Sequence, residues 1–62
     1  MNNEIQSECE YIFAMYKRKE INYNNMLWKM SKLVGNNVTV EQQKDIVRII
    51  TPDKDFFIRK CI

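Results

Sequence analysis

Hydrophobic residues recur at helical spacing through the first part of the chain. They fall three or four residues apart, as one side of an amphipathic helix requires: Ile5, Cys9, Ile12, Phe13 and Tyr16. Acidic residues lie toward the start of this stretch and basic residues toward its end, which is the order that the helix dipole favours. The pattern predicts a helix from about residue 3 to residue 20.

A second helical pattern follows a polar break. Asn22 can cap the start of a helix, and Gly35 stands where a left-handed C-terminal cap favours a residue without a side chain. The apolar positions between them share one side: Met26, Leu27, Met30, Leu33 and Val34. These signals predict a helix over residues 23–34.

The last third of the chain has weaker helical signals. Thr39 and Gln42 have the form of a capping box before an apolar run, which predicts a third helix over about residues 40–50. Thr51 followed by Pro52 can start a short fourth helix over about residues 52–60. A strand-like tail is the alternative there, because the run at residues 56–58 is also β-prone.

The expected fold class is therefore all-α, a small bundle of three helices plus a short C-terminal fourth helix or strand-like tail. We expect a single helical domain over residues 1–62, because so short a chain has no residues to spare for a second core. The expected core combines the apolar sides of the three main helices: Ile12, Phe13, Tyr16, Leu27, Met30, Leu33, Ile46, Val47 and Ile50.

The composition argues against catalysis. The chain has no His, which removes the usual general acid or base and the commonest metal ligand. Its two cysteines, Cys9 and Cys61, cannot complete a four-ligand zinc site. No sequence motif of nucleotide, metal or phosphate binding is present. We expect no enzymatic activity, no cofactor, no metal and no small-molecule substrate.

The setting can also be anticipated from the sequence. The first residues show neither the basic nor the apolar region of a secretory leader, which indicates a cytoplasmic protein. In that reducing environment we expect Cys9 and Cys61 to be buried thiols, with a disulfide between them as the alternative. The longest apolar run, at residues 11–16, is too short to cross a membrane.

Two aromatic residues lie off the apolar stripes of their helices. Trp28 and Tyr11 are either buried by another element that wraps the helix or part of an exposed patch that binds protein, since Trp and Tyr concentrate binding energy. The second interpretation predicts this partner-binding set: Tyr11, Met15, Arg18, Trp28, Lys32 and Phe56. The function expected is that of a small regulator, inhibitor or adaptor that binds a larger protein or associates with itself as a homodimer.

DNA binding is the alternative function. The second helix, Gly35 and the third helix resemble a helix-turn-helix, with Ser31 as the small residue four positions before the turn glycine. Glu41 and Lys44 stand where that motif has apolar residues, and the net charge of +2 is low for a DNA-binding protein. The residues that would contact DNA in this interpretation are Lys29, Lys32, Gln42, Gln43 and Arg48.

Overall fold

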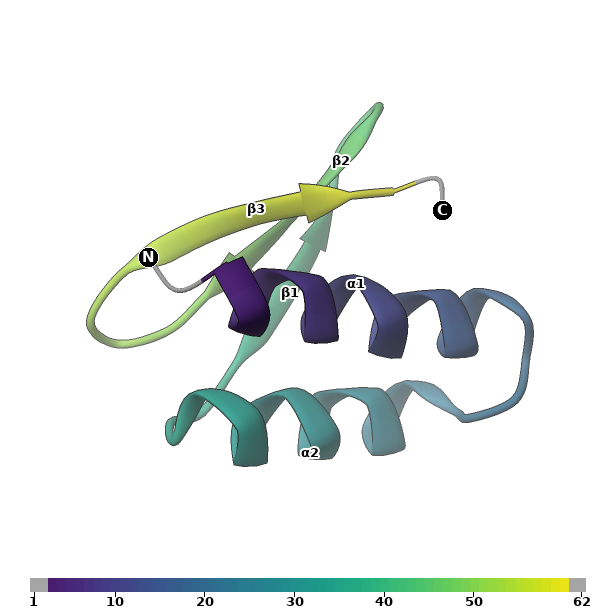
Figure 1. The fold of residues 1–62 in the computed structure, drawn as a ribbon, viewed down its shortest axis with the longest axis horizontal. Coiled ribbons are helices and arrows are strands. Elements are labelled where there is room, and N and C mark those ends of the chain that lie inside the picture. The colour runs from purple at the N-terminus through teal and green to yellow at the C-terminus, as the bar shows by residue number, and fades with distance from the viewer. Residues whose placement is uncertain (1–2, 61–62) are drawn as a thin grey trace.

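Two helices are followed by a three-stranded antiparallel sheet in a computed structural model that describes residues 3–60 (Figure 1). The elements are α1 (Asn3–Lys17), α2 (Tyr23–Val34), β1 (Thr39–Gln42), β2 (Ile46–Ile50) and β3 (Asp55–Arg59). The strands lie in the order β1-β2-β3, so each strand pairs with the next one in the sequence. The fold class is α+β.

The all-α prediction is wrong for residues 39–59. The segment expected to form the third helix forms the β1–β2 hairpin instead. Most of the segment expected to form the fourth helix is β3, so the strand-like alternative for this tail is the one observed. β-branched residues are dense in both β1 and β2, and they fit an extended backbone better than a helix. The capping-box pattern of Thr39 and Gln42 was outweighed by this strand preference and by pairing with distant segments.

The two N-terminal helices are confirmed. Helix α2 has the expected bounds: Asn22 Oδ1 accepts a hydrogen bond from the Asn25 amide at 2.8 Å, and Gly35 takes the left-handed conformation with φ of 78°. Helix α1 ends at Lys17, three residues earlier than expected. Its end is closed by Lys19, which has φ of 66°, and by a hydrogen bond from the Glu20 amide to the Met15 carbonyl at 2.9 Å.

Alternation along the strands decides which side chains enter the core. Val47 and Ile49 on β2 point inward and are fully buried, together with Phe56 and Ile58 on β3. The inward sheet face and the helices share one core: Cys9, Ile12, Phe13, Met26, Met30, Val47, Ile49, Phe56 and Ile58.

The expected core needs correction on β2. Ile46 is 36% exposed and Ile50 is half-buried, because both lie on the outer face of the sheet with Arg48 between them. A helical period places residues 46, 47 and 50 on one face. A strand places residues 47 and 49 on one face and residues 46, 48 and 50 on the other. Three further members of the expected core, Tyr16, Leu27 and Leu33, are partly buried and pack against it.

The two edges of the sheet differ. At the β3 edge, Gln6 on α1 donates from Nε2 to the Phe57 carbonyl at 3.2 Å, and Glu10 accepts from the Arg59 amide at 3.1 Å. At the β1 edge, the ladder register turns the backbone groups of Val40 and Gln42 away from β2. Within residues 3–60, no side chain bonds to these groups. Helix α1 therefore closes one edge, and the other stays open.

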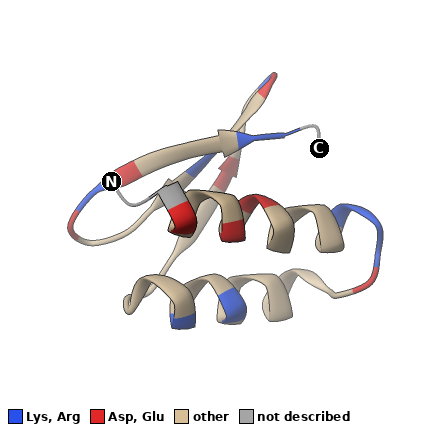
Figure 2. Cartoon of the chain, viewed as in Figure 1, with Lys and Arg blue, Asp and Glu red and all other residues tan. Residues whose placement is uncertain are grey.

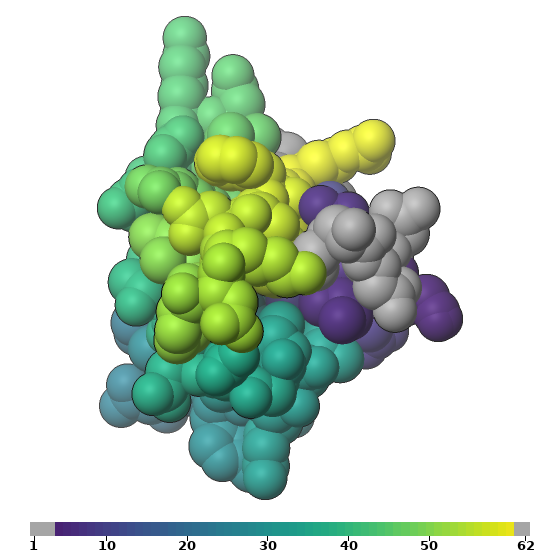
Figure 3. Space-filling view, turned by 90° about the vertical axis from the view of Figure 1, so that its left-hand side faces the viewer, coloured from purple at the N-terminus to yellow at the C-terminus, as the bar shows by residue number. Residues whose placement is uncertain are grey.

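The loop that follows α2 contacts the turn between β2 and β3. Figure 3 shows the residues that follow α2, in teal, against the β2–β3 turn, in yellow-green. Asn36 donates from Nδ2 to Asp53 Oδ2 at 3.1 Å across this contact, and Thr51 closes the turn by accepting from the Lys54 amide at 3.1 Å. The loop after α2 is thereby held against the hairpin that carries β3.

Candidate protein-binding surface

Helices α1 and α2 lie side by side and run in opposite directions (Figure 1), and an open groove of about 410 Å³ separates them on the surface. We call it the helical groove. Helix α1 lines one wall with Glu8, Tyr11, Ile12 and Met15, and helix α2 lines the other with Lys29, Lys32 and Leu33. Its floor is apolar, and charged groups stand on both walls.

Two large aromatic side chains are exposed on this part of the molecule. Tyr11 on α1 is 58% exposed and Trp28 on α2 is 60% exposed. The ammonium of Lys32 lies 5.6 Å from the centre of the Trp28 ring, in a cation–π contact that joins Trp28 to the groove wall. Neither ring is buried by the sheet, because the inward faces of the helices fill the core with other side chains.

The structure brings together four of the six residues predicted to bind a partner. Tyr11, Met15 and Lys32 line the helical groove, and Trp28 adjoins it through Lys32. Arg18 follows the end of α1, where its guanidinium pairs with Glu20 at 2.7 Å; this hydrogen bond raises the pKa of Arg18 and lowers that of Glu20.

Phe56 does not belong to the surface. It lies on β3 with 5% of its area exposed and is part of the core. The helical prediction for residues 52–60 put it beside Arg59 and Lys60, whereas in the strand it points inward and Arg59 points outward. The exposed aromatic residue of this strand is its neighbour Phe57, at 48%.

The residues predicted to contact DNA do not form a recognition helix. Lys29 and Lys32 lie in the helical groove, but Gln42 ends β1, Gln43 starts the β1–β2 turn and Arg48 is central in β2. The second helix of the expected helix-turn-helix is absent, since residues 39–50 form the hairpin. That geometry is therefore wrong for this chain.

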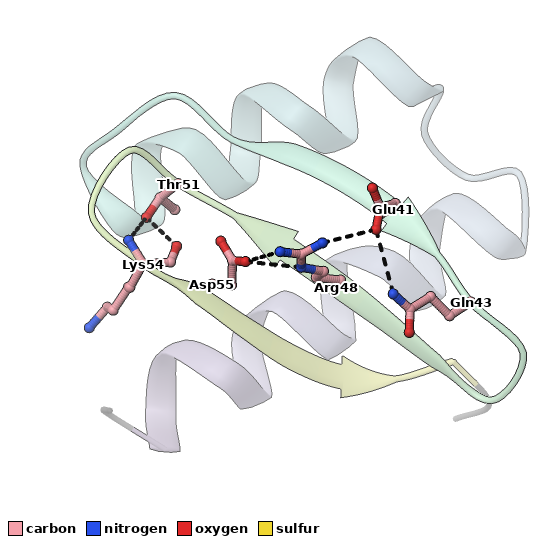
Figure 4. Close-up of polar contacts among 6 residues, drawn as sticks. All are labelled: Glu41, Gln43, Arg48, Thr51, Lys54 and Asp55. Atoms are coloured by element: carbon pink, nitrogen blue, oxygen red, sulfur yellow. Dashed lines mark hydrogen bonds and ion pairs between the residues drawn. The ribbon is translucent and has the colours of Figure 1, made fainter.

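Arg48 is held by acidic neighbours on the outer face of the sheet. Its Nε donates to Asp55 Oδ2 at 3.0 Å, its Nη2 also contacts that oxygen, and its Nη1 donates to Glu41 at 3.3 Å (Figure 4). The hydrogen bonds to Asp55 and then to Glu41 raise the pKa of Arg48. Flanked by two carboxylates, this guanidinium is poorly placed to attract a phosphate.

Sequence reasoning missed two contributors to the groove. Glu8 is not in the predicted partner-binding set, and Leu33 was assigned to the core. A signal for Glu8 exists, because Glu8, Tyr11 and Met15 are spaced three and four residues apart and therefore share one side of α1. Leu33 is partly buried, so it contacts the core and lines the groove as well.

Cys9, the cysteine among residues 3–60, does not lie on this surface. The Cys9 side chain is fully buried as a free thiol, and burial, followed by the charge of Glu8, raises its pKa to about 11. At neutral pH the thiol is therefore protonated and a poor nucleophile. The expected state of Cys61 lies outside the described residues.

Residues 3–60 contain no group of three or more cysteine, aspartate or glutamate side chains placed to hold a metal ion. No helix among them has the length and apolar character needed to cross a membrane.

Comparison of the chain with protein-family models, with curated proteins and with solved structures gives no match. Function is therefore inferred from the geometry of the helical groove and its surroundings.

Proposed function

We propose that the protein is a non-catalytic interaction module, a small regulator, inhibitor or adaptor that binds another protein through the helical groove. The observation that carries the proposal is the exposure of Tyr11 and Trp28, at 58% and 60%, on the two helices that form the groove. A small soluble fold gains stability by burying such rings, so their exposure on neighbouring elements favours a binding role.

The energetics support this role. A Tyr or Trp side chain buries on the order of 200 Å² when fully covered. Covering the exposed part of each ring would contribute roughly 3 kcal/mol at about 25 cal/mol per Å², before the losses of freedom on association. Two such anchors beside an apolar floor formed by Ile12, Met15 and Leu33 have the composition of an interface centre.

The charged groups would orient the partner. Lys29 and Lys32 on one wall and Glu8 on the other surround the apolar floor, as polar rims surround the centres of interfaces. Such rim charges change association rates and register more than affinity. The protonated, buried thiol of Cys9 supports the non-catalytic part of the proposal and fits a reducing, cytoplasmic location.

Site-specific photo-crosslinking in cells that make the protein tests the proposal. Benzoylphenylalanine replaces Tyr11 or Trp28 in separate variants, and Phe57 in the control, because Phe57 is an exposed aromatic residue on the outer face of the sheet. We expect a discrete crosslinked protein from positions 11 and 28 and none from position 57. Crosslinks at position 57 alone, or at none of the three positions, would contradict the proposal.

Duplex DNA provides the competing outcome. In the alternative function, a mobility shift on duplex DNA would weaken steeply as salt rises. We expect no shift, because the predicted base-reading residues Gln42 and Gln43 lie at the end of a strand and in a turn. A salt-sensitive shift that disappears in Lys29→Ala and Lys32→Ala variants would assign the basic wall to DNA instead.

A further inference from the structure

The two walls of the helical groove carry opposite charges. Glu8 stands on the α1 wall, and Lys29 and Lys32 stand on the α2 wall, where Figure 2 shows basic positions and no acidic one. Because these side chains line the same short groove, they occupy overlapping positions along its length. A surface with this arrangement is complementary to a copy of itself.

We propose that the occupant of the helical groove is a second copy of this chain, related by a two-fold axis that runs along the groove. The inference deepens the proposed function and rests on it. Rotation by 180° about that axis lays α1 of one copy over α2 of the other. Glu8 of each copy then faces Lys29 and Lys32 of the other, so the favourable contact occurs twice.

The direction of the axis follows from the charges. A two-fold axis across the groove would lay α1 on α1 and α2 on α2, which sets Glu8 near a second acidic wall and the lysines near a second basic wall. The axis along the groove avoids both repulsions. It also brings the aromatic ring of Tyr11 on one copy toward the helix that carries Trp28 on the other.

The size of the contact sets the expected strength of the dimer. Helix α1 has 15 residues and is about 22 Å long, and two packed helices lie about 10 Å apart. Stacking two such faces buries roughly 1,000–1,300 Å² in total, at the lower end of specific interfaces. The dimer should therefore have a Kd on the order of micromolar and dissociate on dilution.

Sedimentation velocity of the full chain across a dilution series is the first test. We expect a monomer–dimer equilibrium in which Tyr11→Ala and Trp28→Ala each raise Kd about tenfold or more. Phe57→Ala is the matched control, because it removes an exposed aromatic ring from the opposite side of the molecule, and it should leave Kd unchanged. Circular dichroism confirms that each variant folds.

Charge exchange tests the direction of the axis. Glu8→Lys makes both walls basic, and the double variant Lys29→Glu with Lys32→Glu makes both acidic, so each variant alone should dimerise about tenfold more weakly. An equimolar mixture of the two should form a heterodimer, because each wall then faces an opposite charge. All three substitutions in one chain should restore the homodimer.

Several results would overturn the inference. A monomer at every concentration excludes a second copy as the occupant. A dimer that is insensitive to Tyr11 and Trp28 but weakened by Phe57→Ala uses the sheet face instead. A dimer that Glu8→Lys does not weaken removes the axis along the groove, because about the axis across the groove this substitution exchanges one like-charge contact for another. If the chain is monomeric but positions 11 and 28 still crosslink to a different protein, the proposed function stands and the self-association alone is wrong.

Discussion

Two adjacent isoleucines on β2 provide a sharp test of the fold. Ile49 points from the sheet toward the helices and is fully buried, whereas Ile50 is half-buried on the outer face of the sheet. Replacing each with Val removes one methylene and keeps the β-branched shape, so the strand preference of the backbone is unchanged. The two variants therefore differ only in what surrounds the lost carbon.

The expected magnitudes follow from burial. An Ile→Val change in a core costs about 0.5–1.5 kcal/mol, and the complete burial of Ile49 places it in the upper half of that range. For a domain of this size, about 1 kcal/mol lowers Tm by about 4–8 °C. Ile50→Val removes a carbon from a surface that is already partly hydrated, so we expect a loss below about 0.5 kcal/mol.

Urea unfolding followed by circular dichroism near 220 nm measures both variants. Far-ultraviolet circular dichroism is preferred to fluorescence, because the Trp28 side chain is already 60% exposed in the folded protein. With a urea dependence of about 1 kcal/mol per M, Ile49→Val should lower the midpoint by about 1 M. An equal or larger effect of Ile50→Val would refute the inward register of Ile49 and the strand with it.

Two further changes test local features. Lys19→Gly should stabilise the protein by about 0.5–1 kcal/mol, because Lys19 has φ of 66° and Gly adopts that conformation without strain. Lys17→Gly, at the last residue of the helix, should destabilise the protein by at most a similar amount, and a loss in both variants would disprove the left-handed cap. The Cys9 thiol is protonated in both states well below pH 9 and ionises first in the unfolded chain, because burial raises its folded pKa from 9.0 to about 11. The free energy of unfolding should therefore fall by about 2 kcal/mol from pH 9 to pH 11, and this part of the decrease should be missing in a Cys9→Ala variant.

The helices could be predicted from the sequence because their signals are local. Asn22 and Gly35 bracket α2 within a single stretch, and both caps form as expected. The end of α1 was missed, since a left-handed Lys19 has no sequence signature comparable to a glycine. Local caps and a long apolar stripe therefore suffice to predict the bounds of a helix when its C-terminal cap is a residue that favours the left-handed conformation, such as Gly35.

The strands were missed because their evidence is not local. Five residues at Ile46–Ile50 fit a helical stripe and an alternating strand about equally, and only pairing with β1 and β3 selects the strand. The error then propagated to the site. Phe56 was placed on the surface because its direction was taken from a helix. Tyr11 and Trp28 were placed off the apolar stripes of helices that do form, and of the two alternatives left open for them, burial and exposure, the structure shows exposure.

The unequal edges of the sheet limit how molecules of this protein can aggregate. With β3 capped by Gln6 and Glu10, β1 is the open edge among the described strands, and strand pairing between molecules at this edge stops once two molecules have joined. Detachment of α1 would uncover the second edge, and each molecule could then bridge two neighbours. Fibre growth would thus depend on local unfolding of the first helix rather than on loss of the whole fold.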